Sequence, residues 1–191
     1  MKRASPIRRG LEEGATVLLE TLAREEAVIE RIARLFGATV RRGRTIFFCG
    51  NGGSAAEAQH FAAELVGRFE RERRALPAVA LTTDSSILTS VGNDYGFGRV
   101  YARQIEGLGR RGDLLVALTT SGRSPNILAA VRSARARGLR VVGMTGAAGV
   151  AFARKCDLCL VVPSRSTPRI QEVHLAVGHL CCERAEALAG R

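Results

Sequence analysis

Five short apolar runs recur along this chain, each between longer segments whose apolar residues follow helical spacing. Two of them, LLVAL at residues 114–118 and RVVGM at residues 140–144, show almost no alternation of apolar and polar residues. A strand buried on both faces has this pattern, whereas a half-exposed strand alternates. The chain is therefore predicted to form a doubly wound α/β domain with a parallel sheet covered by helices. The predicted strands are Thr45 to Cys49, Ala78 to Leu81, Leu114 to Leu118, Arg140 to Met144 and Leu158 to Val162.

Two of the predicted strands end in the same way. The sequence VALTT occurs at residues 79–83 and again at residues 116–120. In open α/β sheets, ligands bind at the carboxyl ends of the strands. We therefore expect these hydroxyl-rich turns to lie at the edge of the sheet where a ligand binds.

A long helical segment precedes the first strand. Apolar residues recur every three or four positions from Leu11 to Val40, which predicts an amphipathic helix. We divide the chain into an N-terminal helical oligomerisation arm, residues 1–42, and a main domain, residues 43–191. A second long helix is expected from Ile170 to Ala189, after Pro168 as a helix breaker.

Composition and charge exclude several classes of protein. No stretch of the 191 residues approaches the roughly 18 apolar residues of a membrane helix. Glu12 and Glu13 follow the basic start, where a secretory signal would have its apolar core, so we expect a cytoplasmic protein. The formal net charge is +11, but Glu70 and Glu72 interrupt the densest basic run, so we expect no nucleic-acid partner.

The cysteines do not suggest a disulfide framework, because there are five of them and they lie in apolar segments. Cys156 and Cys159 have the spacing of half a zinc site, but no second pair with this spacing exists in the chain. We expect reduced, partly buried thiols, with a metal or redox role as the alternative.

A glycine-rich turn follows the first predicted strand, in the sequence CGNGGSAAE at residues 49–57. It matches neither the dinucleotide-binding nor the P-loop pattern. Three glycines would let backbone N–H groups approach a ligand, and Ser54 with Glu57 has the spacing of a capping box. A tight strand-to-helix turn with no ligand is the alternative interpretation.

The third predicted strand ends in TTSGRSPN, at residues 119–126. Pro125 fits the first position of a helix and Ser124 its N-cap. Hydroxyl groups beside a helix N-terminus favour a phosphate, because the N–H groups and the helix dipole both attract an anion. We predict that this loop binds one terminal phosphate of a small molecule, rather than being an ordinary polar loop.

Two of the three histidines are candidates for proton transfer. His60 and Glu64 lie four residues apart and share one helix face. His179 lies eight residues after Gln171, about 80° around the last helix, so both could line one cleft. His174 is on another face, and we expect a hydrogen-bonded or half-exposed histidine there.

Taken together, these segments resemble the sugar isomerase (SIS) domain family, and within it the bacterial phosphoheptose isomerases. The matching motifs are CGNGGSAAEAQHFAAEL, SVGNDYGF, TTSGRSPN and RIQEVHLAVGH, in this order. The resemblance implies a five-stranded parallel sheet flanked by helices. It also implies a homotetramer in which the N-terminal helices pack between subunits and the active sites lie at subunit boundaries.

The family reaction interconverts sedoheptulose 7-phosphate and D-glycero-D-manno-heptose 7-phosphate, the first step towards activated heptoses. By resemblance, Glu64 is the base that removes the C1 proton, and His179 is the acid that serves the C2 oxygen through an enediol. Asn93 and Asp94 would reach sugar hydroxyls, and Gln171 would orient the substrate. The implied sugar contacts are Asn51, Gly52, Gly53 and Ser54, and the implied phosphate contacts are Thr119, Thr120, Ser121 and Ser124.

The resemblance also implies a zinc ion held by His60, Glu64, Gln171 and His179. The two roles of Glu64 conflict, because a carboxylate bound to zinc is a poor free base. Zinc would act there as a Lewis acid on the substrate oxygens.

Non-catalytic members of the family are the main alternative. Proteins that bind a replication initiator resemble this sequence, but that branch is expected to lack the acid at position 64 and the histidine at position 179. Both are present here, which favours the enzyme. Isomerisation of another ketose, or sensing of a phosphosugar without turnover, are further alternatives.

Overall fold

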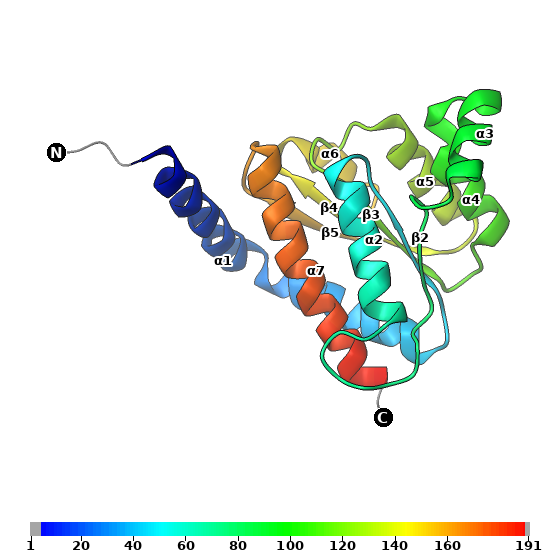
Figure 1. Ribbon diagram of the computed structural model, residues 1–191, viewed down its shortest axis with the longest axis horizontal. Coiled ribbons are helices and arrows are strands. Elements are labelled where there is room, and N and C mark those ends of the chain that lie inside the picture. Colours follow the sequence, from blue (N-terminus) through cyan, green and yellow to red (C-terminus); the bar gives the residue numbers. More distant parts are fainter. Residues whose placement is uncertain (1–4, 190–191) are drawn as a thin grey trace.

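The computed structural model describes residues 5–189, and the five predicted runs form its strands (Figure 1). The strands are β1 (Ile46–Cys49), β2 (Ala78–Ala80), β3 (Leu114–Thr119), β4 (Arg140–Gly146) and β5 (Leu158–Val162). The helices are α1 (Pro6–Arg41), α2 (Gly53–Val66), α3 (Ser85–Tyr95), α4 (Val100–Leu108), α5 (Pro125–Ala136), α6 (Val150–Ala153) and α7 (Thr167–Ala189). Two 3₁₀ turns, η1 (Phe97–Arg99) and η2 (Ala147–Gly149), precede α4 and α6.

The strands form one parallel sheet in the order β2-β1-β3-β4-β5. Residues of β3 are completely buried, as expected of a central strand covered on both faces. The predicted doubly wound α/β fold with a five-stranded parallel sheet is therefore confirmed. Residues 1–4, which were assigned to the helical arm, lie outside the described residues.

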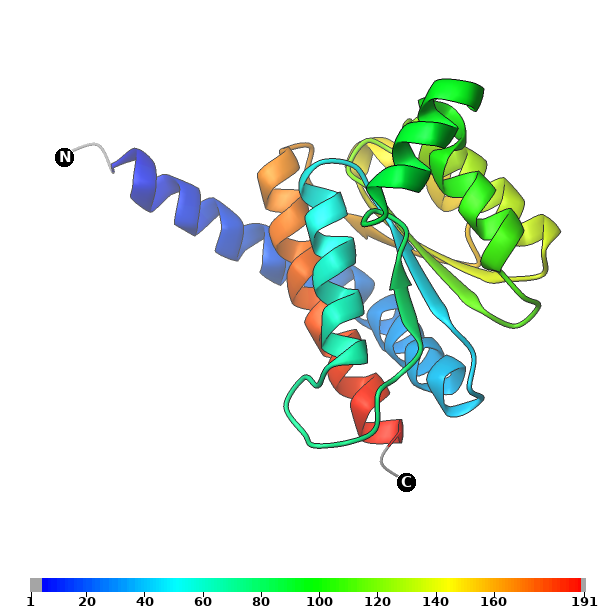
Figure 2. The same cartoon turned by 45° about the vertical axis from the view of Figure 1, so that its right-hand side comes forward.

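Helices cover both faces of the sheet and give the domain two hydrophobic cores (Figure 2). On one face, the core joins α1, α2 and α7 to the sheet through the rings of Phe36, Phe48 and Phe61. On the other face, α4 and α5 pack on Phe47 and Leu115. Successive residues of β1 thus point into different cores, because side chains alternate along a strand.

The strand order places a switch point between β1 and β3. From β1 the chain moves to β2 on one side, and it later returns to β3 on the other side. Connections that leave in opposite directions open a crevice at the carboxyl ends of two such strands. The glycine turn after β1 and the hydroxyl-rich loop after β3 meet at this crevice.

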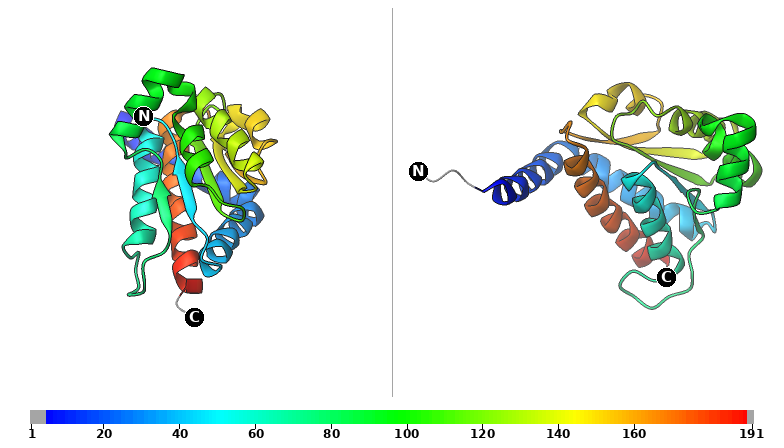
Figure 3. Two further views of the ribbon diagram at one scale, coloured as in Figure 1. Left: turned by 90° about the vertical axis from the view of Figure 1, so that its right-hand side faces the viewer. Right: turned by 45° about the horizontal axis from the view of Figure 1, so that its top comes forward.

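Helix α1 has two parts with different surroundings. Its first half extends away from the sheet (Figures 1 and 3), and the exposed apolar residues Leu11 and Leu22 lie there. In its second half, Ile32, Phe36 and Val40 are fully buried in the core. The helix ends at Arg41, next to the division drawn between residues 42 and 43, but half of the predicted arm is part of the main hydrophobic core.

Both long helices begin before the apolar pattern does. Ser5 caps α1 by accepting a hydrogen bond from the Arg8 N–H at 3.1 Å, and Pro6 is its first residue. Helix α7 begins at Thr167, so Pro168 lies in its first turn and the expected break there is wrong. Proline is tolerated at this position because first-turn N–H groups have no partner within the helix. Among residues 5–189, no helix has the length and hydropathy of a membrane span.

All five cysteines are free, and Cys156 and Cys159 are half-buried beside Gly143. A hydrogen bond to Cys156 and burial both raise the pKa of Cys159, which keeps this thiol protonated. Reduced, partly buried thiols were expected, and the structure places them in the second core.

Candidate active site

The glycine turn after β1 directs the chain into α2 earlier than predicted. Gly52 has φ +56° and is the N-cap of α2, so Ser54 lies inside the first turn and is buried. The predicted capping box of Ser54 and Glu57 is therefore wrong, because a glycine that adopts positive φ starts the helix two residues sooner. Gly53 leaves room for Gln171, since a Cβ at position 53 would lie only 2.6 Å from Nε2 of Gln171.

Freed from capping, the Ser54 hydroxyl accepts a hydrogen bond from Nε2 of Gln171 at 3.3 Å. This bond links the first turn of α2 to α7 near the carboxyl ends of the strands. Glu57 is buried behind it, and burial raises the pKa of Glu57 to about 7, an effect that Ser54 only partly opposes. A buried carboxyl group close to the site is a feature that the sequence analysis did not identify.

Asn51 is held by residues that the sequence analysis also missed. Its carboxamide pairs with that of Asn126, with N···O distances of 2.9 and 2.8 Å in the two directions. The Tyr101 hydroxyl donates to the Gly50 carbonyl oxygen at 2.5 Å and fixes the start of the turn. Asn126 is the last residue of TTSGRSPN, so the motif contained the signal, whereas nothing local marked Tyr101.

The hydroxyl-rich loop after β3 is ordered by its own side chains. Oγ1 of Thr119 accepts from the Gly122 N–H at 3.2 Å, and Oγ of Ser121 accepts from the Arg123 N–H at 3.2 Å. Ser124 is the N-cap of α5 and Pro125 its first residue, as predicted. The amino end of α5, where the helix dipole favours an anion, therefore lies at this loop.

These two segments line one cavity of about 320 Å³, a size within the range of small-molecule sites. It lies at the switch point between β1 and β3. The predicted substrate contacts that line it are Asn51, Gly52, Gly53, Ser54, Thr119, Thr120, Ser124 and Gln171. Leu118 and Thr167, which were not predicted, also line it, whereas the predicted phosphate contact Ser121 does not. A polar cavity of hydroxyl, amide and glycine backbone groups at a helix N-terminus suits a phosphate attached to a polyol.

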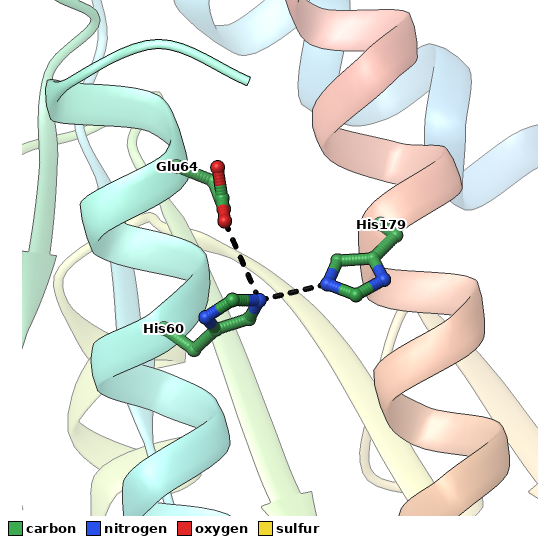
Figure 4. Close-up of side chains that lie close together, drawn as sticks. All are labelled: His60, Glu64 and His179. Atoms are coloured by element: carbon green, nitrogen blue, oxygen red, sulfur yellow. Dashed lines mark hydrogen bonds and ion pairs between the residues drawn. The ribbon is translucent and has the colours of Figure 1, made fainter. Parts of the chain in front are cut away.

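His60, Glu64 and His179 form a second cluster, between α2 and α7 (Figure 4). The Nε2 atoms of the two histidines lie 2.7 Å apart, and Oε1 of Glu64 lies 3.5 Å from Nε2 of His60. The three ligand atoms all lie within 4.8 Å of one another. The side chains of His60 and Glu64 are 42% and 22% exposed, so a bound molecule can reach them.

The two clusters lie at different heights on the same pair of helices. Gln171 and His179 are separated by eight residues, which is about 12 Å along a helix axis. Gln171 contacts Ser54 at the cavity, whereas His179 contacts His60. Within one chain, none of the three residues of the second cluster lines the cavity. A single cleft was expected from the angle between Gln171 and His179 around the helix, but the rise of about 12 Å between them outweighs that angle.

The other predicted residues lie apart from both clusters. Asn93 and Asp94 are exposed on α3, and Nδ2 of Asn93 donates to Oδ1 of Asp94 at 2.8 Å. His174 is fully buried, and neither ring nitrogen has a hydrogen-bond partner among the described residues, so the expected hydrogen-bonded or half-exposed histidine is wrong on both counts. Burial lowers the pKa of His174 to about 4, which the backbone of Thr145 only partly offsets, and the imidazole is neutral near pH 7.

Comparisons with known proteins agree with this architecture. Residues 11–146 match the SIS domain, and the chain belongs to the SIS domain family. Within that family it falls among the phosphoheptose isomerases. The phosphoheptose isomerase of Roseiflexus sp. (strain RS-1) is 52% identical over 92% of this chain and 89% of its own length. That of Bradyrhizobium sp. (strain BTAi1) is 58% identical over 82% of this chain and 79% of its own length.

Solved structures show the same relationship. The phosphoheptose isomerase of Neisseria gonorrhoeae superposes with a TM-score of 0.89 at 40% identity, over 95% of this chain and 97% of that one. The enzyme from Francisella tularensis gives 0.91 at 37% identity, over 95% and 96% of the two chains. The sugar isomerase domain of a transcription factor from Sphaerobacter thermophilus, at 20% identity and a TM-score of 0.65, shares the fold alone. The family predicted from the sequence motifs is confirmed.

Proposed function

We propose that this chain is an aldose–ketose isomerase that interconverts sedoheptulose 7-phosphate and D-glycero-D-manno-heptose 7-phosphate. The observation that carries the proposal is the combination of a carboxylate and two imidazoles within 4.8 Å of one another. The reaction also needs a site for the substrate's phosphate, and the polar cavity at the switch point suits one. Membership among the phosphoheptose isomerases supports the choice of substrate.

The chemistry needs one base and one acid on neighbouring atoms of the sugar. Glu64 removes the proton from C1, the C–H electron pair forms the C1–C2 double bond, and His179 donates a proton to the C2 oxygen. The resulting enediol gives its O1 proton to His179 as the carbonyl forms at C1, and Glu64 returns a proton to C2, so both side chains regain their starting protonation states. Proton transfer by positioned side chains typically contributes a factor of about 10²–10⁴ in rate.

The second cluster also fits a zinc ion, and we propose His60, Glu64 and His179 as its ligands. Two imidazoles and a carboxylate are a donor set that zinc accepts in catalytic sites, with a fourth position left open. When bound, zinc would polarise the substrate oxygens as a Lewis acid. The resemblance implies Gln171 as a fourth ligand. Its Nε2 donates to Oγ of Ser54 at 3.3 Å in this structure, so Gln171 would have to leave that hydrogen bond to bind the ion. A metal-bound Glu64 would be a poor base, so the zinc and the free-base assignments make different predictions.

We further propose a homotetramer in which a neighbouring copy completes each site. Ile7, Leu11, Leu18, Leu19 and Leu22 are between 44% and 78% exposed on the projecting half of α1. Such a stripe of apolar side chains favours burial against another copy of the chain. Because the cavity and the second cluster are separated within one chain, a phosphate held by one copy would present its sugar to Glu64 and His179 of a neighbour.

The catalytic proposal is tested by a proton NMR time course with sedoheptulose 7-phosphate in D₂O. An aldose anomeric signal with deuterium at C2 is the expected result. A folded protein that gives neither exchange nor product would instead support a phosphosugar sensor or a protein-binding member of the family. Parallel samples with a chelator, and with zinc restored, distinguish the two assignments of Glu64, because turnover that survives complete metal removal excludes a required zinc ion.

The shared site is tested by combining two impaired variants in one assembly. Glu64→Gln removes the base and Ser121→Ala with Ser124→Ala weakens the phosphate site. Co-expressed subunits should regain part of the activity if each site draws on two copies, because some sites then contain neither change. No recovery in a verified hybrid would place each complete site within one chain.

A cytoplasmic location, where free sugar phosphates are found, belongs to the same proposal.

A further inference from the structure

A buried ion pair joins α7 to the segment between α2 and β2. Glu186 is on α7, seven residues after His179, and is 2% exposed. Its Oε1 lies 3.2 Å from Nε of Arg73, whose side chain is 4% exposed. Burial by itself would raise the pKa of Glu186, but backbone N–H groups and Arg73 outweigh it and lower the pKa. The carboxylate is therefore charged near neutral pH.

The same carboxylate organises the segment between α2 and β2. It accepts three consecutive backbone N–H groups, from Phe69 at 3.0 Å, Glu70 at 2.9 Å and Arg71 at 2.8 Å. Successive N–H groups that converge on one anion make strong, charge-assisted hydrogen bonds and fix the local backbone. Glu186 thus sets the conformation of residues 69–71.

Arg73 connects this segment to the end of α2. Its Nη2 donates to the Glu64 carbonyl oxygen at 2.8 Å, and its Nη1 donates to the carbonyl oxygens of Leu65 and Gly67 at 2.9 and 2.8 Å. The last carbonyl groups of a helix have no partners within the helix, so the guanidinium satisfies them. The helix turn that carries Glu64 is therefore tied to Glu186 through Arg73.

The segment also places an aromatic ring on His179. The centroid of the Phe69 ring lies 5.6 Å from that of the His179 imidazole, with 32° between the ring planes. Phe61 approaches the same imidazole edge-on, with 6.5 Å between the ring centroids, and Nε2 of His60 lies 2.7 Å from Nε2 of His179. The rotamer of His179 depends on these three neighbours, and Glu186 holds one of them in place.

We propose that Glu186 is a positioning residue for the isomerase reaction, acting through Phe69 on His179 and through Arg73 on the turn that carries Glu64. The inference rests on the proposed function for its kinetic consequence. Glu186 itself touches neither the cavity nor the second cluster. Its loss should therefore lower kcat and leave the KM for the phosphosugar nearly unchanged, because the phosphate contacts lie on another part of the fold.

The test compares Glu186→Gln with a matched control, Asp113→Asn. Asp113 is 4% exposed and likewise accepts backbone N–H groups, from Thr45 at 3.0 Å and Arg110 at 2.8 Å, but these partners precede β1 and β3 and belong to neither α2 nor α7. Below both melting transitions, Glu186→Gln should lose about tenfold or more in kcat with KM within about twofold, since small misplacements of catalytic groups are costly. The control should keep its kcat. Equal kcat values for the two variants would overturn the proposal.

A second measurement does not depend on turnover. The chain has three histidines, so selective labelling gives a simple spectrum in which the ring protons of His179 report the ring current of Phe69. In Glu186→Gln, these signals should move towards their position in Phe69→Leu, while in Asp113→Asn they should stay in place. Unmoved signals in Glu186→Gln would refute the positioning role even if the chain were not an isomerase.

Phe69→Leu keeps the inference testable if Glu186→Gln does not fold. This variant retains an apolar side chain and leaves the ion pair intact. It should lower kcat with little change in KM or melting temperature. A kcat equal to that of the unmodified protein would show that the contact between residue 69 and His179 does not matter for the reaction, and the proposal would fail.

Discussion

The carboxamides of Asn51 and Asn126 pair with each other, with N···O distances of 2.9 and 2.8 Å. Asn51 belongs to the turn after β1 and Asn126 to the first turn of α5, so the pair joins the two sides of the crevice. Asn126 also accepts a hydrogen bond from the Ile127 N–H at 3.0 Å, which fixes the direction in which its amide points. The orientation of Asn51 is thereby set by a residue on another element.

Replacing Asn126 by Ala should leave the Asn51 amide without its partner. We expect about 1–3 kcal/mol lower stability in urea unfolding and a raised KM for the sugar phosphate. In a double-mutant cycle with Asn51→Ala, the two effects should be clearly non-additive. Additive effects would mean that the amide pair does not orient the sugar contact.

Glu64→Gln should keep the fold and abolish turnover. The neutral amide occupies nearly the same volume but cannot accept the C1 proton, so kcat should fall by a factor of about 10²–10⁴. Glu30→Gln is the matched control, because Glu30 is an exposed α1 residue paired with Arg34 at 3.1 Å. A turnover rate for Glu64→Gln equal to that of the control would exclude Glu64 as the base.

Ser121→Ala combined with Ser124→Ala should weaken binding of the phosphosugar by about tenfold or more, since each lost hydrogen bond to a charged group contributes about 1.5–3 kcal/mol. Titration calorimetry in the Glu64→Gln background measures binding without turnover. Unphosphorylated sedoheptulose serves as the control ligand, and its weaker binding should change little. Unaltered affinity for the phosphosugar would place the phosphate elsewhere.

The buried imidazole of His174 makes stability dependent on pH. Its pKa is about 4 in the folded chain, against an ordinary value of 6.5, so the unfolded state takes up a proton first as the pH falls. Stability should therefore decrease by about 2 kcal/mol between pH 7 and pH 5 because of this one group. His174→Leu should lack that share of the decrease in denaturant unfolding at the two pH values. Equal losses in both proteins would show that His174 is not buried and neutral.

The projecting half of α1 should be needed for assembly. Leu18 and Leu22 are 44% and 51% exposed, and their replacement by Glu should dissociate the tetramer because charged side chains resist burial between subunits. Light scattering measures the change in mass. Leu108→Glu, at a residue that is 51% exposed on α4, is the matched control and should not alter the mass. An unchanged mass for the α1 variant would remove this helix from the interface.

The local sequence was sufficient to predict the strands and most helix starts, because apolar runs and glycine turns act on neighbouring residues. The five strands and the N-cap at Ser124 follow from spacing and residue type. Two predicted helix starts were wrong, one beside a glycine and one beside a proline. Gly52 starts α2 before Ser54, and Pro168 lies within α7 instead of preceding it.

The candidate residues could be chosen from the sequence, but their grouping could not. Spacing placed His60 beside Glu64, since four residues span about one helical turn. It gave no information on the contact between His60 and His179, which are 119 positions apart in the chain. It also did not reveal that Gln171 lies with Ser54 rather than with His179.

The sequence by itself determined the alternation of strands and helices, the turns that end β1 and β3, and the identities of the groups able to move protons or bind phosphate. The tertiary structure decided which of those groups meet. The packing of α2 against α7 sets the contact of His60 with His179, and the buried pair of Arg73 with Glu186 sets the segment behind it. Periodicity describes one element at a time, whereas an active site depends on the axial position of each helix relative to its neighbour, which only the packing of side chains in the core fixes.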